Sequence, residues 1–161
     1  MREVVRNNFF ISTNKDKLDI SFIQNYLSKK SYWAKNITNE IVKKSINGSI
    51  CFGLYVNNNK ETVPATLIFD KQIGFARVIT DQATFAYIAD VFVIEKFRGI
   101  GLSKWLMEEI MSYPNLQGLR RWLLATRDAH GLYAKYGFLP LDKPELMMNF
   151  KPFENYPETD S

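Results

Sequence analysis

The sequence predicts a single mixed α/β (α+β) domain in which helices flank a mixed central sheet. Its 161 residues suit one domain, and 46% hydrophobic with 24% charged residues is close to an average globular composition. Hydrophobic periodicity gives the order β-α-α-β-β-β-β-α-β-α-β, in which strands and helices alternate only in the second half. Because no repeat or linker divides the chain, we expect one domain over 1–161, with its core at about 9–150 and a frayed tail at 152–161.

A strand at Phe9–Ser12 and two helices form the first part of the chain. Asp19 is the expected N-cap of the first helix, Thr38 is the expected N-cap of the second, and Gly48 ends the second. Apolar residues recur at helical spacing in both segments, namely Ile20, Ile23, Tyr26 and Leu27, then Ile37, Ile41, Val42 and Ile46. Each helix therefore has one apolar face for the core.

Strands dominate the middle of the chain. Short apolar and aromatic runs predict strands over Ile50–Val56, 62–69, 73–80 and Phe85–Val93. Asparagines at 57–59 and the polar residues 70–72 predict the turns between the first three.

Two helices and two strands are expected in the last third. A helix over 101–113 has Leu102, Trp105, Leu106 and Ile110 on one stripe. A short buried strand follows over 121–125, and then a helix over 128–136 that Gly137 ends as a C-terminal cap. An apolar run over 146–150 predicts a closing strand.

Composition argues against several classes of function. The net charge is +4, and the basic residues are scattered in pairs, whereas a nucleic-acid binder gathers them into one stripe. No apolar run is long enough to cross a membrane, and the first residues lack the apolar stretch of a secretory signal. One cysteine and one histidine argue against a disulfide and a metal cluster. We therefore expect a cytoplasmic protein with no nucleic acid, membrane or metal partner.

A glycine-rich loop lies between the strand Phe85–Val93 and the helix that follows it. Its glycines would let a ligand approach the backbone, and the unpaired N–H groups of the first helical turn would attract an anion such as a diphosphate. Arg98 adds a positive charge. A plain tight turn is the alternative. Lys104 stands where the dinucleotide-binding fingerprint needs its third glycine, and the Walker pattern is absent.

Two blocks of sequence resemble motifs of the GNAT family of N-acetyltransferases. Residues 91–93 (VFV) followed by Arg98-Gly99-Ile100-Gly101-Leu102-Ser103 are similar to motif A, R/Q-x-x-G-x-G/A, with Ser103 in the last position. Residues 129–138 (AHGLYAKYGF) are similar to motif B, A-x-x-L-Y-x-x-x-G-F, although Thr126 replaces the asparagine common upstream. The resemblance covers about residues 9–150 and implies a GNAT fold.

The resemblance implies acetyl-CoA as the cofactor and a primary amine, expected on a small molecule, as the acceptor in a direct transfer. Main-chain groups of Phe92 and Val93 are expected to hold the pantetheine, and a backbone amide near Val91–Val93 is expected to stabilise the oxyanion. The diphosphate is expected over Arg98, Gly99, Ile100, Gly101, Leu102 and Ser103. Thr126 is expected to contact the cofactor, with one hydrogen bond altered relative to the asparagine common at this position. A homodimer is also expected, since GNAT domains often dimerise.

Tyr133 is the expected general acid, because a phenol stays protonated at neutral pH and can protonate a departing thiolate. Core packing is its alternative role. Asp90 is the lone charge within Phe85–Val93, and strand alternation puts it on the face of Ile88 and Phe92. It is either the base that accepts the amine proton or a structural acceptor for an arginine or a backbone N–H.

Tyr32 and Trp33, between the first two helices, are expected either to line the acceptor pocket or to pack in the core. His130 is expected at the surface, and Cys51 is expected to be a buried small hydrophobe. Two rival functions stay open: a non-catalytic acyl-CoA-binding module of the same fold, and a nucleotide-binding domain. The second needs an acidic residue after the next strand, and residues 122–124 (WLL) supply none.

Overall fold

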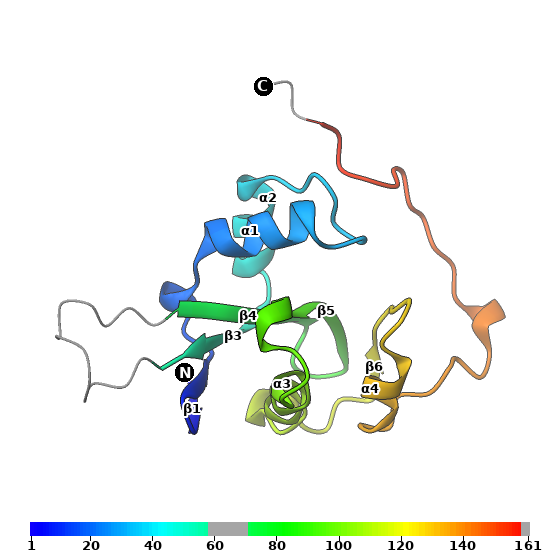
Figure 1. The fold of residues 1–161 in the computed structure, drawn as a ribbon. Helices are drawn as coiled ribbons and strands as arrows, with labels where there is room; N and C mark the ends of the chain where they lie inside the picture. The colour runs from blue at the N-terminus through cyan, green and yellow to red at the C-terminus, as the bar shows by residue number, and fades with distance from the viewer. Residues whose placement is uncertain (58–70, 159–161) are drawn as a thin grey trace, which may run out of the picture.

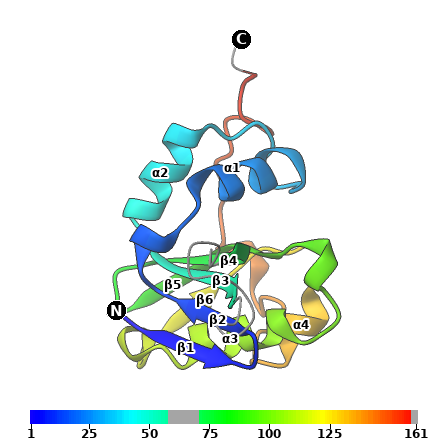
Figure 2. The same ribbon diagram turned by 60° about the vertical axis from the view of Figure 1, so that its left-hand side comes forward.

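Six strands form one sheet in the order β1-β2-β3-β4-β5-β6 in the computed structural model, which describes residues 1–57 and 71–158 (Figure 1, Figure 2). Neighbours from β1 to β5 are antiparallel, whereas β6 pairs with β5 in parallel. Helices cover both faces, so the mixed α/β fold class is confirmed. The strands are β1 (Glu3–Arg6), β2 (Phe9–Ser12), β3 (Ile50–Val56), β4 (Lys71–Thr80), β5 (Phe85–Val93) and β6 (Arg121–Leu123).

Three features of the sheet differ from the sequence-based expectations. β1 is an additional strand. Its four residues are mostly exposed and show too little alternation of apolar and polar side chains to predict a strand from the sequence. β4 begins at Lys71, so the expected turn is wrong at Lys71 and Gln72, which pair with β3. β6 ends at Leu123 and is half-exposed, because it lies at the edge of the sheet. The strand expected over 62–69 and the turn residues 58, 59 and 70 lie outside the described residues.

Helices α1 (Ile20–Lys29) and α2 (Asn39–Asn47) cover one face of the sheet (Figure 2). Both begin at the expected caps: the Asp19 side chain accepts from the Phe22 N–H, and the Thr38 side chain accepts from the Ile41 N–H. The side chains that they bury pack against the sheet in a single cluster that includes Ile23, Leu27, Val42, Ile46, Phe75 and Phe92. Burying each such side chain contributes about 1.5–3 kcal/mol.

Helix α3 (Leu102–Met111) covers the opposite face (Figure 1). A second apolar cluster lies between α3 and the sheet and includes Trp105, Leu106, Ile110, Phe52, Val78 and Ile88. The short helix α4 (His130–Ala134) lies beyond β6, shorter than the expected 128–136, and the chain leaves it through Gly137 at φ 86°. In the described ranges, no helix combines the length and apolar character needed to cross a membrane.

The C-terminal segment does not return to the sheet, so the strand expected over 146–150 is wrong. A single 3-10 turn (Pro144–Leu146) interrupts an extended path on which Met148 and Phe150 are more than 90% exposed. An apolar run favours an extended backbone, but a strand also needs a partner, and this path runs away from the edge strand (Figure 1). Phe138, whose ring packs against Tyr133, is the last residue before this path that contacts the core.

The tail is anchored again at Tyr156, whereas the sequence predicts fraying from Pro152. The Tyr156 N–H donates to the Lys35 carbonyl at 3.1 Å, and its carbonyl accepts from the Asn36 side chain at 3.2 Å. The Tyr156 side chain also packs against the cluster beneath α1 and α2. One segment from the end of the chain thus reaches the loop between the first two helices.

Candidate active site

The glycine loop has the geometry of an anion cradle. A 3-10 turn (Glu95–Phe97) leads from β5 into the loop, where Gly99 has φ 82° and Gly101 has φ 86°. Residues with a side chain rarely adopt these angles, and nothing lies within 4 Å of where a Cβ on either glycine would stand. Gly101 is the N-cap of α3 and has no side chain to cap it, so the N–H groups of the first turn face open space at the positive end of the helix dipole.

Arg98 is tethered beside this loop. Its Nε donates to the Val93 carbonyl at 2.9 Å, and a terminal nitrogen donates to the Tyr26 hydroxyl at 2.9 Å. The Tyr26 ring in turn stacks on Phe92, with ring centroids 3.7 Å apart. The guanidinium thus fixes the loop to the end of β5 and to α1, and it keeps a positive charge next to the cradle.

The edge of β5 is open along its second half. β5 and β6 pair only from Phe85↔Arg121 to Tyr87↔Leu123, after which β6 ends and β5 continues to Val93. Among the described residues, no strand pairs with this edge of β5 beyond Tyr87. Val91, Phe92 and Val93 lie on this stretch, which runs towards the glycine loop. An extended ligand could form main-chain hydrogen bonds there in place of a strand.

A bulge at Asp90 interrupts β5. Asp90 has φ 53°, and the register with β4 shifts between Phe75 and Arg77, where β5 contains one extra residue. Ile88 packs in the cluster under α3, whereas Phe92 packs in the cluster under α1 and α2. The expectation that Asp90 shares one face with both is therefore wrong, because the extra residue breaks the period of two.

Both carboxylate oxygens of Asp90 are engaged. Oδ1 accepts from the Trp33 indole N–H at 2.9 Å, and Oδ2 accepts from the Arg77 Nε in a close ion pair. Arg77 also donates to the Ser49 hydroxyl at 3.3 Å. Asp90 is 8% exposed. The ion pair with Arg77 is the kind of contact expected if Asp90 is a structural acceptor for an arginine.

Tyr133 lies on α4 and is 9% exposed. Burial, together with smaller contributions from the charges of Tyr32 and Asp128, raises the pKa of its phenol to about 12. The hydroxyl is therefore protonated throughout the neutral range. Thr126 positions this helix, because its Oγ1 accepts from the Ala129 N–H at 3.0 Å, directly before α4 begins.

Tyr32 and Trp33 lie on the loop between α1 and α2, and this loop is tied to both sides of the opening between β5 and β6. Trp33 reaches Asp90, as described above, while the Tyr32 hydroxyl accepts from the Arg127 N–H at 2.9 Å. The Arg127 guanidinium also lies 4.0 Å above the centre of the Tyr32 ring. Both rings are 41% exposed although their polar ends are fixed.

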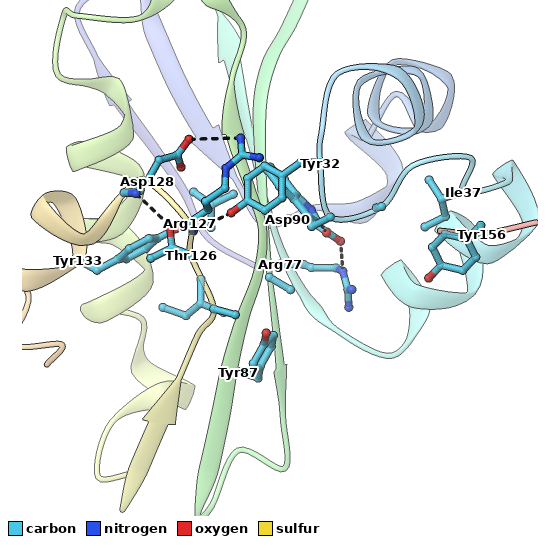
Figure 3. Close-up of a pocket in the computed structure, with 17 residues that line it drawn as sticks. Tyr32, Ile37, Arg77, Tyr87, Asp90, Thr126, Arg127, Asp128, Tyr133 and Tyr156 are labelled. Carbon is cyan, nitrogen blue, oxygen red and sulfur yellow. Dashed lines mark hydrogen bonds and ion pairs between the residues drawn. The ribbon is translucent and has the colours of Figure 1, made fainter. Parts of the chain in front are cut away.

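These elements enclose a cleft of about 520 Å³ (Figure 3). It brings together six of the residues predicted from the sequence: Tyr32, Trp33, Asp90, Val91, Thr126 and Tyr133. The glycine loop, Phe92 and Val93 do not line it. The predicted residues thus gather at two sites, an anion cradle at the end of β5 and a cleft beside the bulge. The open edge of β5 connects the two sites.

The sequence analysis missed eleven of the seventeen lining residues, and five of these carry a charged or tyrosine side chain: Arg77, Tyr87, Arg127, Asp128 and Tyr156. Arg77 had a usable signal, since it is the lone charge of the strand expected over 73–80, as Asp90 is of the next. Tyr156 had none, because only the folded path of the tail brings it there.

The remaining reactive side chains lie apart from this cleft. Cys51 is 1% exposed, as expected, and burial raises the pKa of its thiol to about 11. His130 is exposed at the start of α4, also as expected. Within residues 1–57 and 71–158, no three His, Cys, Asp or Glu side chains gather to hold a metal ion.

Comparison with known proteins gives a uniform result. A family model described as the acetyltransferase (GNAT) domain matches residues 47–140. A Gibberella zeae protein named as a proposed acetyltransferase is 30% identical over an alignment of 141 positions that covers 81% of this chain and 78% of that protein. A crystal structure of a proposed GNAT-family acetyltransferase from Xanthomonas campestris is 46% identical, covers 89% of this chain and 92% of its own, and has a TM-score of 0.80.

A Clostridium acetobutylicum acetyltransferase crystallised with acetyl-CoA shares the fold alone: it is 15% identical, covers 89% of this chain and 95% of its own, and has a TM-score of 0.61. The fold and these relatives define the protein as an acetyltransferase. More narrowly, the chain belongs to the GNAT family, because the family model spans more than half of it. Acetyltransferases of this family use acetyl-CoA as the acetyl donor.

Proposed function

We propose that this protein is an N-acetyltransferase that transfers the acetyl group of acetyl-CoA directly to the primary amine of a small molecule. The observation that carries the proposal is Tyr133, a phenol with a pKa of about 12 on the wall of the cleft. The group is a proton donor at every pH at which the protein would act. It stands beside the gap between β5 and β6, on the side of the acceptor cleft.

The glycine loop and the open edge of β5 fit coenzyme A. The space above Gly99 and Gly101 and the free N–H groups at the start of α3 suit a diphosphate. Arg98 and Ser103 would complete this cradle. The edge of β5 at Phe92 and Val93 would hold the pantetheine through its main chain, in the place that a neighbouring strand leaves free.

Acetyl-CoA, when bound, supplies an activated thioester. The neutral amine attacks the thioester carbon, so that a C–N bond forms, and the C–S bond then breaks. A backbone N–H near Val91, where the bulge turns the chain, would stabilise the oxyanion. Tyr133 gives its proton to the leaving sulfur, and the phenolate regains a proton from solvent. Water takes one proton when the ammonium group of the acceptor becomes the neutral amine, and it takes a second from the same nitrogen once the C–N bond has formed.

In this proposal Asp90 positions other groups and does not act as the base. One of its oxygens holds Trp33 and the other faces Arg77, so the carboxylate already holds two side chains in place. The carboxylate instead fixes the acceptor wall and the bulge relative to each other.

The deciding experiment measures thiol release from acetyl-CoA in the presence of a panel of primary amines. Turnover that requires both an amine and Tyr133 supports the proposal. Binding of acetyl-CoA in calorimetry without turnover for any amine would favour the rival function, a non-catalytic acyl-CoA-binding module.

A further inference from the structure

Different residues line the two ends of the cleft, and this difference bears on the kind of acceptor that fits it. Tyr133 stands at one end of the cleft, and Ile37 and Tyr156 stand at the other (Figure 3). If the reacting amine meets the thioester beside Tyr133, as proposed above, the rest of the acceptor must extend towards Ile37 and Tyr156. The lining of this far part therefore reports on the body of the acceptor rather than on its amine.

Aromatic rings line much of the space between the two ends. Tyr32 and Trp33 form an edge-to-face pair with ring centroids 5.0 Å apart, and Tyr87 points into the cleft from β5 (Figure 3). The hydrogen bonds from Trp33 to Asp90 and from Arg127 to Tyr32 fix the two exposed rings. Rings held in place but left 41% exposed offer flat apolar surface to a ligand at little entropic cost.

The C-terminal segment contributes the far wall. Tyr156 is held by its backbone to Lys35 and Asn36, next to the loop that carries Tyr32 and Trp33. Its ring also contacts Phe153 at a centroid distance of 5.5 Å. The wall is thus part of the folded structure, although it comes from the last residues described.

The charges of the cleft are paired among themselves. Arg77 is neutralised by Asp90, and Arg127 lies over the Tyr32 ring with its guanidinium 3.9 Å from Asp128. Arg127 is the second cation among the lining residues, and its guanidinium faces the Tyr32 ring and Asp128. Asp128 is loosely paired and 68% exposed, and its charge already acts on Tyr133, so it is placed to attract one ammonium group.

We infer that the acceptor is a primary amine on an aromatic or bulky apolar body, an arylalkylamine in chemical terms. The body lies against Tyr32 and Trp33 with Tyr156 as its end wall, and the ammonium enters beside Asp128. This inference rests on the proposed function and names its substrate class.

The test compares five amines in the thiol-release assay. Tryptamine and 2-phenylethylamine carry a ring, butylamine carries none, spermidine is a polycation, and glucosamine 6-phosphate is an anion. We expect kcat/KM for both ring amines to exceed that of butylamine by about tenfold or more, with the sugar phosphate the poorest. Equal or better turnover of butylamine, spermidine or the sugar phosphate would overturn the inference and leave the proposed function standing.

Two matched variants test the far wall. Tyr156→Ala should raise KM for 2-phenylethylamine about tenfold without changing KM for acetyl-CoA, whereas Phe150→Ala, in the same segment but 91% exposed and away from the cleft, should change neither. An unchanged KM in Tyr156→Ala, in a variant with the parent melting temperature, would remove the end wall from the proposal.

A binding measurement separates this inference from the proposed function. Titration with 2-phenylethylamine should change the fluorescence of Trp33, and Trp33→Phe should abolish that change while circular dichroism stays the same. If no amine is acetylated but this response is seen, the proposed function fails and the ligand class stands. If the amines are acetylated but no such response occurs, the ligand class fails alone.

Discussion

A 2.9 Å hydrogen bond joins the indole nitrogen of Trp33 to the carboxylate of Asp90. It crosses from the loop between α1 and α2 to the bulge in β5, so one contact aligns the proposed acceptor wall with the strand whose open edge we propose for the cofactor. Because Asp90 also faces Arg77, the contact belongs to a set of three side chains from three different parts of the chain.

Asp90→Asn should destabilise the protein and leave the pH dependence of catalysis in place. The change removes the charge opposite Arg77 and leaves that guanidinium buried without a counter-charge, so the free energy of unfolding should fall by about 3 kcal/mol. Chemical denaturation measures the loss. Glu108→Gln is the control, because it breaks an exposed pair with Arg6 and should cost less than about 1 kcal/mol. Unchanged stability together with a shifted acidic limb of the pH–rate profile would make Asp90 the base.

Tyr133→Phe should lower kcat by about 10²–10⁴-fold with little change in KM for acetyl-CoA, because it removes the proton donor and keeps the ring. Tyr136→Phe, in the turn directly after α4, loses an exposed hydrogen bond to the Lys104 carbonyl and should keep its kcat. Since the pKa of Tyr133 is about 12, its donor form persists below that pH, and kcat should show no alkaline limb from this group up to about pH 10. Full activity of the Phe variant would reduce Tyr133 to a packing residue.

Gly101→Val should weaken acetyl-CoA binding by at least about tenfold, because a side chain at φ 86° strains the loop and occupies the space above it. Isothermal titration calorimetry measures the affinity. Gly118→Val is a matched control, with φ 75° and equally open surroundings, in a turn after α3 that lies outside the site. Similar affinities in the parent and in folded Gly101→Val would remove the diphosphate from this loop.

Cys51 should make the protein less stable at alkaline pH. Its thiol has an ordinary pKa of 9.0, and burial raises the pKa to about 11 in the folded state, so the folded state holds its proton more tightly than the unfolded state. The resulting stability is fully present below pH 9 and is lost as the pH rises to about 11, and it amounts to roughly 2 kcal/mol. Denaturation curves of Cys51→Ala should lack this part of the decline. Parallel declines in the two proteins would contradict the assignment.

The exposed path of the C-terminal segment should be the first site of cleavage by chymotrypsin. Met148 and Phe150 are more than 90% exposed and lie outside helices and strands, whereas Phe22 and Tyr26 lie within α1. Mass spectrometry of early fragments should therefore find cuts after Met148 or Phe150. Protection of both residues, with cleavage elsewhere first, would mean that another surface covers this segment in solution.

Sequence periodicity predicted the elements that have a clear amphipathic face, and capping residues predicted where α1 and α2 begin. It could not predict the path after Phe138, since the apolar run over 146–150 specifies an extended backbone but no partner for it. The bulge at Asp90 was equally hidden, because one extra residue leaves the sequence of β5 apolar on both sides.

The candidate site was predicted where a local motif carries it. The glycine loop and Tyr133 each lie within one short segment, so the residue pattern contains their geometry. The cleft depends on contacts between distant segments, such as Tyr156 with Lys35, or Arg77 with Asp90 across two strands. Arg77 was within reach of sequence reasoning, as a lone charge opposite another. The role of Tyr156 required the folded chain.

The left-handed backbone of Asp90 restricts which amino acids the bulge can accept. Most residues with a Cβ are strained at φ 53°, glycine adopts it freely, and aspartate and asparagine tolerate it. Glycine at position 90 would relax the backbone but would lose the hydrogen bond to the Trp33 indole. Glutamate would keep the negative charge, but it adopts a positive φ less readily than aspartate. Position 90 is thus coupled to position 33: in chains that diverge from this one, aspartate or asparagine should persist wherever the tryptophan persists, and glycine should enter only where the tryptophan has gone.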